Sequence, residues 1–312
     1  MTTGLKIAFV IFVALAVFFV LVFTGVIRRR EPPPPSVTIQ FWGTNDSEDL
    51  WRDTIQAYTK EFDHVEIKYT EIPEETYEEF LINKLAEGKG PDIFMLKNSW
   101  IEKHKNKINP FPQALEDASG YYPKDFKRTF VDIAADDLIT KDGDIIGMPF
   151  FIDTPVLLYN KDIFNSHKIA IPPKTWDEVV EVSRSLTELT EVGDIIRSGI
   201  AMGSATNVER FPEIISSLIF QAGDTIIDNQ GIDLTSSAEN ALAFYTSFAD
   251  PTKSHYSWNI RMKNSHDALA DGTAAMAIGL SSDIARIKAR NPHLNLGIAP
   301  FPQQKNANQP VV

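Results

Sequence analysis

The chain contains no cysteine among its 312 residues. Disulfides, thiolate metal sites, cysteine nucleophiles and lipid anchors on cysteine are therefore excluded. The common catalytic motifs are also missing, because there is no G-x-S-x-G, H-E-x-x-H, Walker A or dinucleotide-binding glycine pattern. The six histidines are scattered and form no ligand pair at short spacing. The sequence therefore predicts a protein that is not an enzyme and that needs neither a metal nor a cofactor.

Positive charge is scarce in most of the chain, which has 42 acidic and 30 basic residues and a net charge of −12. Residues 1–31 hold four basic groups and one acidic group, a net of +3, so the remaining chain carries −15. The chain after residue 31 is acidic enough to be repelled by phosphate backbones and by anionic lipid surfaces. This distribution argues against nucleic acid as a partner.

An uncharged segment of 21 residues, 7–27, lies near the N-terminus. As a helix it would be about 32 Å long, enough to cross the hydrocarbon core of a bilayer. A cleaved signal peptide is the alternative, but its apolar region is usually shorter and ends in small residues. Here the segment leads directly into three arginines. We therefore predict an uncleaved transmembrane anchor in residues 1–30, with the span at about 7–27.

Residues 31–36 contain four consecutive prolines, which favour an extended spacer between the anchor and a soluble body. The charges on either side of the span give a first indication of its orientation in the membrane. Lys6 precedes the span and Arg28, Arg29 and Arg30 follow it. By the positive-inside rule alone, the C-terminal body would be cytoplasmic.

The first part of the body alternates predicted strands and helices. Residues 37–42 and 65–69 alternate and are rich in β-branched and aromatic residues, and 93–96 form a short apolar run. Helical spacing of apolar residues follows Ser47, and a second helix is expected to begin at Pro73 and end at Gly88. This β-α-β-α-β order predicts a parallel sheet covered by helices.

The second part shows further strands and helices. A turn at 142–144 precedes it, and strands are expected at 155–159, 273–280 and 296–299. Capping boxes at Thr175–Glu178 and Ser236–Glu239 and a proline at 212 mark three helix starts. A fourth helix should run through Ile284 and Ile287 and end before Pro292. We therefore expect two α/β lobes.

Aromatic, amide and carboxylate side chains follow two strands of the first lobe. In open parallel sheets, ligands bind beyond the carboxyl ends of the strands. Planar rings stack on sugars, while amides and carboxylates hydrogen-bond hydroxyls, so this combination suits a neutral polar ligand. For the two tryptophans, packing in the core is an alternative. The candidates are Trp42, Asn45 and Asp46 after the first strand, and Asn98, Ser99 and Trp100 after the third.

Several motifs in a fixed order resemble one known family. The most specific stretch runs from the Gly147–Pro149 region through a Tyr-Asn-Lys-Asp motif at 159–162 to Pro-Pro-Lys-Thr-Trp-Asp-Glu at 172–178. Gly-Pro-Asp-Ile-Phe at 90–94 and Asp-Gly-Thr-Ala-Ala-Met at 271–276 agree with it. Across residues 37–303 the chain resembles the extracellular solute-binding proteins of ABC importers, family 1, which include maltose-type sugar binders.

The resemblance implies a two-lobe periplasmic-binding-protein-like fold of class II type, with lobes at 37–152 and 153–312 that close on a solute. It implies that Asp153, on the strand between the lobes, faces the ligand, and that contacts of the second lobe fall near Asn207, Glu209 and Arg210. The aromatic residue that often stacks on sugar in this family should lie near Ser281 or Ser282. Serines at these positions depart from a maltose-like binding mode.

The implied function is a membrane-tethered extracellular receptor that captures a polar solute, such as a sugar or oligosaccharide, and delivers it to the transmembrane subunits of an ABC permease. The body would then lie outside a single-pass anchor, which overrides the arginine count. A ligand sensor or scaffold that reuses the fold is the alternative, and an anchored hydrolase is a weaker one. Relatives continue past the position that matches residue 312, so we expect the return segment of the first lobe and the last helices of the second lobe to be missing.

Overall fold

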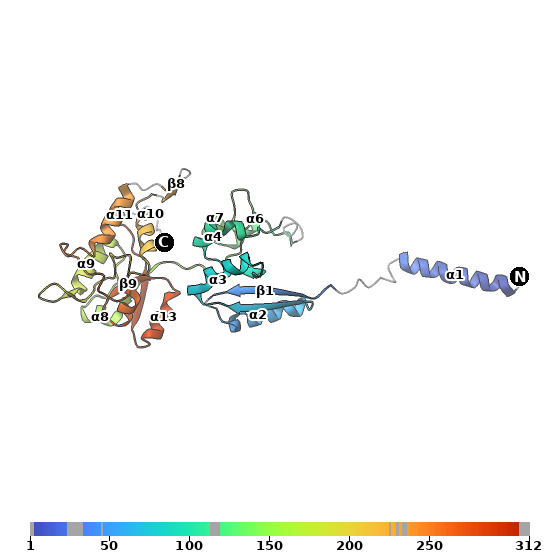
Figure 1. The fold of residues 1–312 in the computed structure, drawn as a ribbon, viewed down its shortest axis with the longest axis horizontal. Coiled ribbons are helices and arrows are strands. Elements are labelled where there is room, and N and C mark those ends of the chain that lie inside the picture. The colour runs from blue at the N-terminus through green and yellow to red at the C-terminus, as the bar shows by residue number, and fades with distance from the viewer. Residues whose placement is uncertain are drawn as a thin grey trace. The chain divides into compact units, whose positions relative to one another are not determined.

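The structure is a computed structural model, and it describes residues 3–23, 34–44, 46–112, 119–224, 226–228, 231–232 and 236–305. The chain divides into two compact units, Met1–Met148 and Pro149–Val312 (Figure 1). Sequence reasoning placed this division four residues later, between residues 152 and 153. Each unit is described separately below.

The N-terminal helix α1 covers Thr3–Phe23. The side chains described within it, at residues 11–20, are exposed. Over the described part of the chain, no helix combines the length and the apolar character that crossing a membrane requires.

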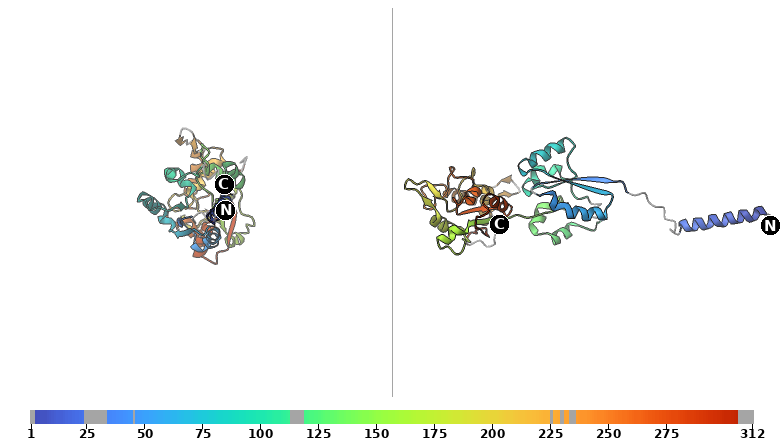
Figure 2. Two further views of the ribbon diagram at one scale, coloured as in Figure 1. Left: turned by 90° about the vertical axis from the view of Figure 1, so that its right-hand side faces the viewer. Right: turned by 90° about the horizontal axis from the view of Figure 1, so that it is seen from below.

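The first unit is built on a parallel sheet of three strands, β1 (Val37–Gly43), β2 (Val65–Glu71) and β3 (Ile93–Phe94), in the order β2-β1-β3. The strands β1 and β2, drawn in blue, run side by side in Figures 1 and 2. Helices α2 (Glu48–Glu61) and α3 (Glu74–Ala86) form the connections. The β-α-β-α-β prediction is confirmed, although β3 is two residues long and not four.

Local sequence explains where α3 begins and ends. Glu74 and Glu75 lie in its first turn, where carboxylates interact favourably with the helix dipole. Gly88 follows the last turn with a φ of +68°, a conformation that glycine adopts without strain. Tyr77 and Leu81 are buried on the inner face of the helix. Both predicted helix ends are therefore confirmed.

The remainder of the first unit consists of short helical segments, and the last two of them contribute Phe126, Ala134 and Ala135 to a small apolar cluster with Ile145. The predicted turn at 142–144 is present, because Gly143 has a φ of +93° and a single antiparallel bridge joins Ile139 to Ile145. The segments are η1 (Asn98–Trp100), α4 (Ile101–His104), η2 (Lys105–Lys107), α6 (Pro123–Thr129) and α7 (Asp132–Leu138).

The second unit contains a sheet of β4 (Val156–Asn160), β9 (Met276–Gly279) and β10 (Leu296–Pro300) in the order β10-β4-β9. Both neighbours run antiparallel to β4. All three strands were predicted, although β9 is shorter than the expected 273–280. Two small antiparallel pairs join β5 (Glu188–Leu189) to β6 (Ile195–Arg197) and β7 (Ile227–Asp228) to β8 (Gly231–Ile232).

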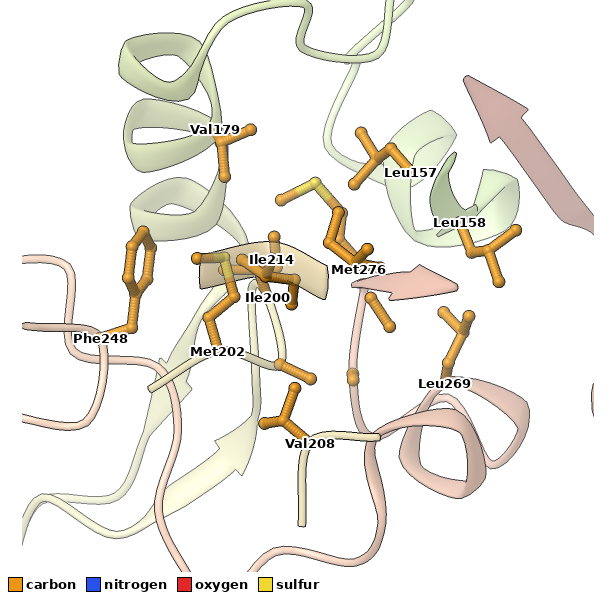
Figure 3. Close-up of a cluster of buried hydrophobic side chains, with 14 of the residues drawn as sticks. Leu157, Leu158, Val179, Ile200, Met202, Val208, Ile214, Phe248, Leu269 and Met276 are labelled. Atoms are coloured by element: carbon orange, nitrogen blue, oxygen red, sulfur yellow. The ribbon is translucent and has the colours of Figure 1, made fainter. Parts of the chain in front are cut away.

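Helices surround this sheet and close a large apolar core. Figure 3 shows Val179, Ile200 and Met276 pointing toward a common centre, and all three are fully buried. The capping box at Thr175–Glu178 is confirmed, since both of its reciprocal hydrogen bonds are present. The helices are α8 (Lys161–Ser166), α9 (Trp176–Leu186), α10 (Phe211–Gln221), α11 (Ser236–Ser247), α12 (Ser265–Ala270) and α13 (Asp283–Arg290).

Candidate functional site

The two candidate tryptophans of the first unit lie against the same apolar cluster. Trp42, at the end of β1, and Trp100, in η1, both pack on Ile72, Tyr77 and Leu81. The ring centroid of Trp42 is 5.3 Å from that of Phe80. The ammonium group of Lys97 lies 5.2 Å from the centroid of the Trp100 ring, within cation–π range. Core packing therefore accounts for the described contacts of both rings.

Two polar oxygens directly after β1 are buried and have no hydrogen-bond partner among the described residues. They are Oγ1 of Thr44 and Oδ2 of Asp46. The hydroxyl of Tyr69 donates to the backbone carbonyl of Asp46 at 2.8 Å and so holds this loop against β2. Burial raises the pKa of Asp46, and the negative charge of Glu71 adds to the effect. Asn45, the third candidate here, lies outside the described residues.

The two polar candidates after β3, Asn98 and Ser99, are exposed and form hydrogen bonds within the first unit. Asn98 Nδ2 donates to Asp137 at 3.1 Å, and Asn98 Oδ1 accepts from the backbone N–H of Ser99 at 2.9 Å. A groove of about 610 Å³ lies elsewhere in this unit, along α2 and β2, and none of the predicted site residues lines it. In the described first unit, the unpartnered polar atoms at the end of β1 are thus the features best suited to a polar ligand.

Three candidates of the second unit come together at the start of α13. Asp153 Oδ1 accepts from the backbone N–H of Ser281 at 2.8 Å and from its hydroxyl at 2.6 Å, and Oδ2 accepts from the backbone N–H of Ser282 at 3.0 Å. Burial acts to raise the pKa of Asp153, but the hydrogen bonds from Ser281 and Ser282 outweigh it and lower that pKa. Both serines are exposed and Asp153 is half-buried. This cluster therefore presents serine hydroxyls to solvent beside an ionised carboxylate.

Asn207 is engaged within the unit. Its Nδ2 donates to the carbonyls of Asn259 and Met262, both at 3.0 Å, and its Oδ1 accepts from the indole N–H of Trp258 at 2.9 Å. Trp258 is fully buried, and sequence reasoning did not single it out. An amide carries two N–H donors, and both are used here.

Glu209 and Arg210 belong to an ion-pair network with three residues that sequence reasoning missed: His266, Asp283 and Arg286. Glu209 contacts Arg286 and lies 2.9 Å from Nδ1 of His266. Burial acts to raise the pKa of Glu209, but hydrogen bonds from His266 and Arg286 lower it to about 2. Arg210 contacts both carboxylate oxygens of Asp283.

One atom each from Glu209, His266 and Asp283 lies within 4.8 Å of the others, a spacing that a metal ion could bridge. The guanidinium groups of Arg210 and Arg286 contact the same two carboxylates. A divalent cation would have to displace both arginines, so the arrangement fits a structural ion-pair network better than a metal site.

The sequence and the fold both match known proteins. The family model for bacterial extracellular solute-binding proteins matches residues 44–311. The chain is 30% identical over 135 residues to the maltotriose-binding protein of Pyrococcus abyssi, an alignment that covers 43% of this chain and 26% of that protein. It is 26% identical over 187 residues to the arabinooligosaccharide-binding protein of Halalkalibacterium halodurans, which covers 59% of this chain and 38% of that protein. The matched region is thus well under half the length of these relatives.

A solved solute-binding protein of an ABC transporter from Thermotoga lettingae, bound with α-D-tagatose, has a TM-score of 0.64 to this chain at 22% identity. The similarity covers 86% of this chain and 69% of that one. At this identity it shows the fold, which is the α/β architecture of the two-lobe binding proteins. The family match spans most of the chain and confirms the resemblance seen in the sequence motifs: this chain belongs to the bacterial extracellular solute-binding protein family.

Proposed function

We propose that this chain captures a neutral polar solute, a sugar or oligosaccharide, outside the cell and delivers it to an ABC permease. Family membership and the names of the relatives, which bind maltotriose and arabinooligosaccharides, support this proposal. The structural observation that carries it is a pair of buried oxygens of Thr44 and Asp46 at the carboxyl end of β1, which have no hydrogen-bond partner among the described residues. Buried polar atoms without a partner are costly, and the hydroxyls of a bound sugar would satisfy them once the loop shifts to admit the sugar.

The charge of this loop favours a neutral ligand over an anion. Asp46 is followed by Glu48 and Asp49 in the first turn of α2, and Glu71 is close enough to raise the pKa of Asp46. A phosphate or carboxylate placed here would meet like charge. Sugar hydroxyls can donate to Asp46 and either donate to or accept from Thr44.

Ligand titrations followed by thermal shift and tryptophan fluorescence test the proposal. The panel is maltotriose, an arabinooligosaccharide, tagatose, glucose 6-phosphate and spermidine. We expect a neutral sugar to raise the melting temperature in proportion to the logarithm of its concentration, as mass action requires. A folded chain that responds to none of the sugars would contradict the proposal and favour the scaffold alternative.

A pair of single substitutions tests whether the sugar binds at Asp46. Asp46→Ala should weaken binding of the responding sugar about tenfold or more, because a hydrogen bond to a charged group is lost. Asp49→Ala is the matched control, since this exposed carboxylate contacts Arg52 on the same helix. Equal affinities of the two variants would exclude Asp46 from the site.

Membrane tethering is the second part of the proposal and rests on the uncharged residues 7–27. Full-length chain should remain in the membrane fraction after alkaline extraction, while a variant without residues 1–35 should be released. Protease added to intact cells should degrade the body if it lies outside.

Stimulation of the ATPase activity of a permease by the sugar-loaded chain would support delivery, whereas sugar binding without any such stimulation would favour a sensor.

A further inference from the structure

The carboxylate of Asp153 is occupied mainly by donors of this chain. Oδ1 accepts from the backbone N–H of Thr154 at 3.0 Å and from two donors of Ser281, and Oδ2 accepts from the backbone N–H of Ser282. A carboxylate offers about four lone-pair positions. Four donors of this chain therefore occupy this carboxylate, three of them on Oδ1 and one on Oδ2.

These bonds join two distant segments, because Asp153 and Ser281 are 128 residues apart. Asp153 lies just before β4, and the serines form the turn between β9 and α13. The other side of the turn is held as well, since Asp283 accepts from the backbone N–H of Leu280 at 2.8 Å. The turn that presents Ser281 and Ser282 is thus fixed from both sides.

The direction of these hydrogen bonds determines what the hydroxyl of Ser281 can offer a ligand. A hydroxyl has one hydrogen to donate and two lone pairs. The hydroxyl of Ser281 uses its hydrogen on Asp153. Toward a ligand, its exposed oxygen can only accept. A ligand at this turn must therefore bring donors, such as hydroxyl or ammonium groups.

We propose that Asp153 is a positioning residue that holds the turn at Ser281 and Ser282, orients the hydroxyl of Ser281 as an acceptor, and thereby makes this turn select hydrogen-bond donors and reject phosphate esters. This inference rests on the proposed function, since it assumes that the solute reaches the turn. The fully ionised phosphate group of a monoester has only acceptor oxygens, and it would also face the negative charge of Asp153. A neutral sugar meets neither obstacle.

The first test needs no ligand and uses amide hydrogen exchange of the full chain. Asp153→Asn replaces one acceptor oxygen with an NH₂ group that faces a backbone N–H, so the turn should open. We expect the amides of Ser281 and Ser282 to exchange at least tenfold faster than in the wild type. Asp162→Asn is the control, because Asp162 is exposed and accepts a single hydrogen bond from Asn295. Unchanged exchange at both serines in Asp153→Asn would overturn the positioning role.

The second test measures selectivity with glucose and glucose 6-phosphate as a matched neutral and anionic pair, together with maltotriose. The wild type and Asp162→Asn should prefer the neutral member at least tenfold. In Asp153→Asn the hydroxyl of Ser281 is no longer held as a donor to a carboxylate and can donate to a ligand. The preference should therefore shrink at least tenfold, an effect that simple destabilisation does not produce. An unchanged preference would overturn the selection of donors. If the wild type binds no sugar, the proposed function fails with the ligand part of this inference, while hydrogen exchange still decides the role of Asp153.

Discussion

The guanidinium of Arg210 holds the carboxylate of Asp283 at two points, with Nε 2.9 Å from Oδ2 and Nη2 2.5 Å from Oδ1. The Asp283 side chain is only 7% exposed. Arg210 is the residue before α10, and Asp283 is the first residue of α13. This bidentate pair therefore ties the starts of two helices together, and it makes a structural role for Arg210 testable.

Arg210→Ala should destabilise the second unit by about 3 kcal/mol, because it leaves a buried carboxylate without its partner. Urea unfolding followed by circular dichroism measures the change. Arg184→Ala serves as control and should cost less than about 1 kcal/mol, since the Arg184–Glu181 pair is solvent-exposed. Full stability of Arg210→Ala combined with loss of sugar binding would instead identify Arg210 as a ligand contact.

Asn207→Ala should lower the free energy of unfolding by about 2 kcal/mol. The truncation removes three hydrogen bonds and leaves the indole N–H of the buried Trp258 without its acceptor. Thermal unfolding is the measurement, and replacement of the exposed Asn165 by alanine is the control. If stability is unchanged and only ligand affinity drops, the main role of Asn207 is in binding.

Acid should destabilise the second unit through Glu209. The pKa of Glu209 in the folded chain is about 2, against an ordinary value of 4.5. Its contribution to the free energy of unfolding is therefore fully present above pH 4.5 and is lost as the pH falls toward 2. This contribution is at most about 3 kcal/mol. Unfolding free energies measured between pH 2 and 6 should fall less steeply for Glu209→Gln than for the wild type. The exposed Glu181→Gln should follow the wild-type curve, and a Glu209→Gln curve parallel to the wild type would refute this assignment.

Gly199→Ala should strongly destabilise the second unit because a Cβ atom at this position would lie 2.0 Å from the backbone carbonyl oxygen of Ser183. Backbone cannot rotate away as a side chain can, so we expect a loss of about 3 kcal/mol or failure to fold. Gly147→Ala is the matched control, as its Cβ would meet only a side-chain atom of Leu138 at 3.5 Å. Expression and thermal unfolding of the two variants compare them. Equal melting temperatures would mean that α9 does not pack this closely on Gly199.

Much of the fold could be predicted because its signals are local. The capping box at Thr175 and Glu178 satisfies backbone groups within one turn of the helix, so its meaning does not depend on the rest of the chain. Gly88 ends α3 for a similarly local reason, its positive φ. The lengths of β3 and β9 were overestimated because strand ends depend on the partner strands, which the sequence pattern does not contain.

The site was predictable in parts only. Family motifs singled out Asp153, Ser281 and Ser282 separately, but no pattern in the sequence indicated that they bind one another. His266, Asp283 and Trp258 were missed because each looks ordinary in its local context. Their roles come from partners far along the chain, such as the 73 residues that separate Arg210 from Asp283.

The sequence by itself determined the class of this protein: the order of strands and helices, the acidic body, and the family motifs. These follow from local periodicity and composition, which act over a few residues. Only the tertiary structure decided which polar groups find partners among the described residues, as at Asp153 and Asn207, and which do not, as at Thr44 and Asp46. The reason is that a hydrogen bond requires two groups about 3 Å apart, and folding alone brings residues from distant parts of the chain to that distance.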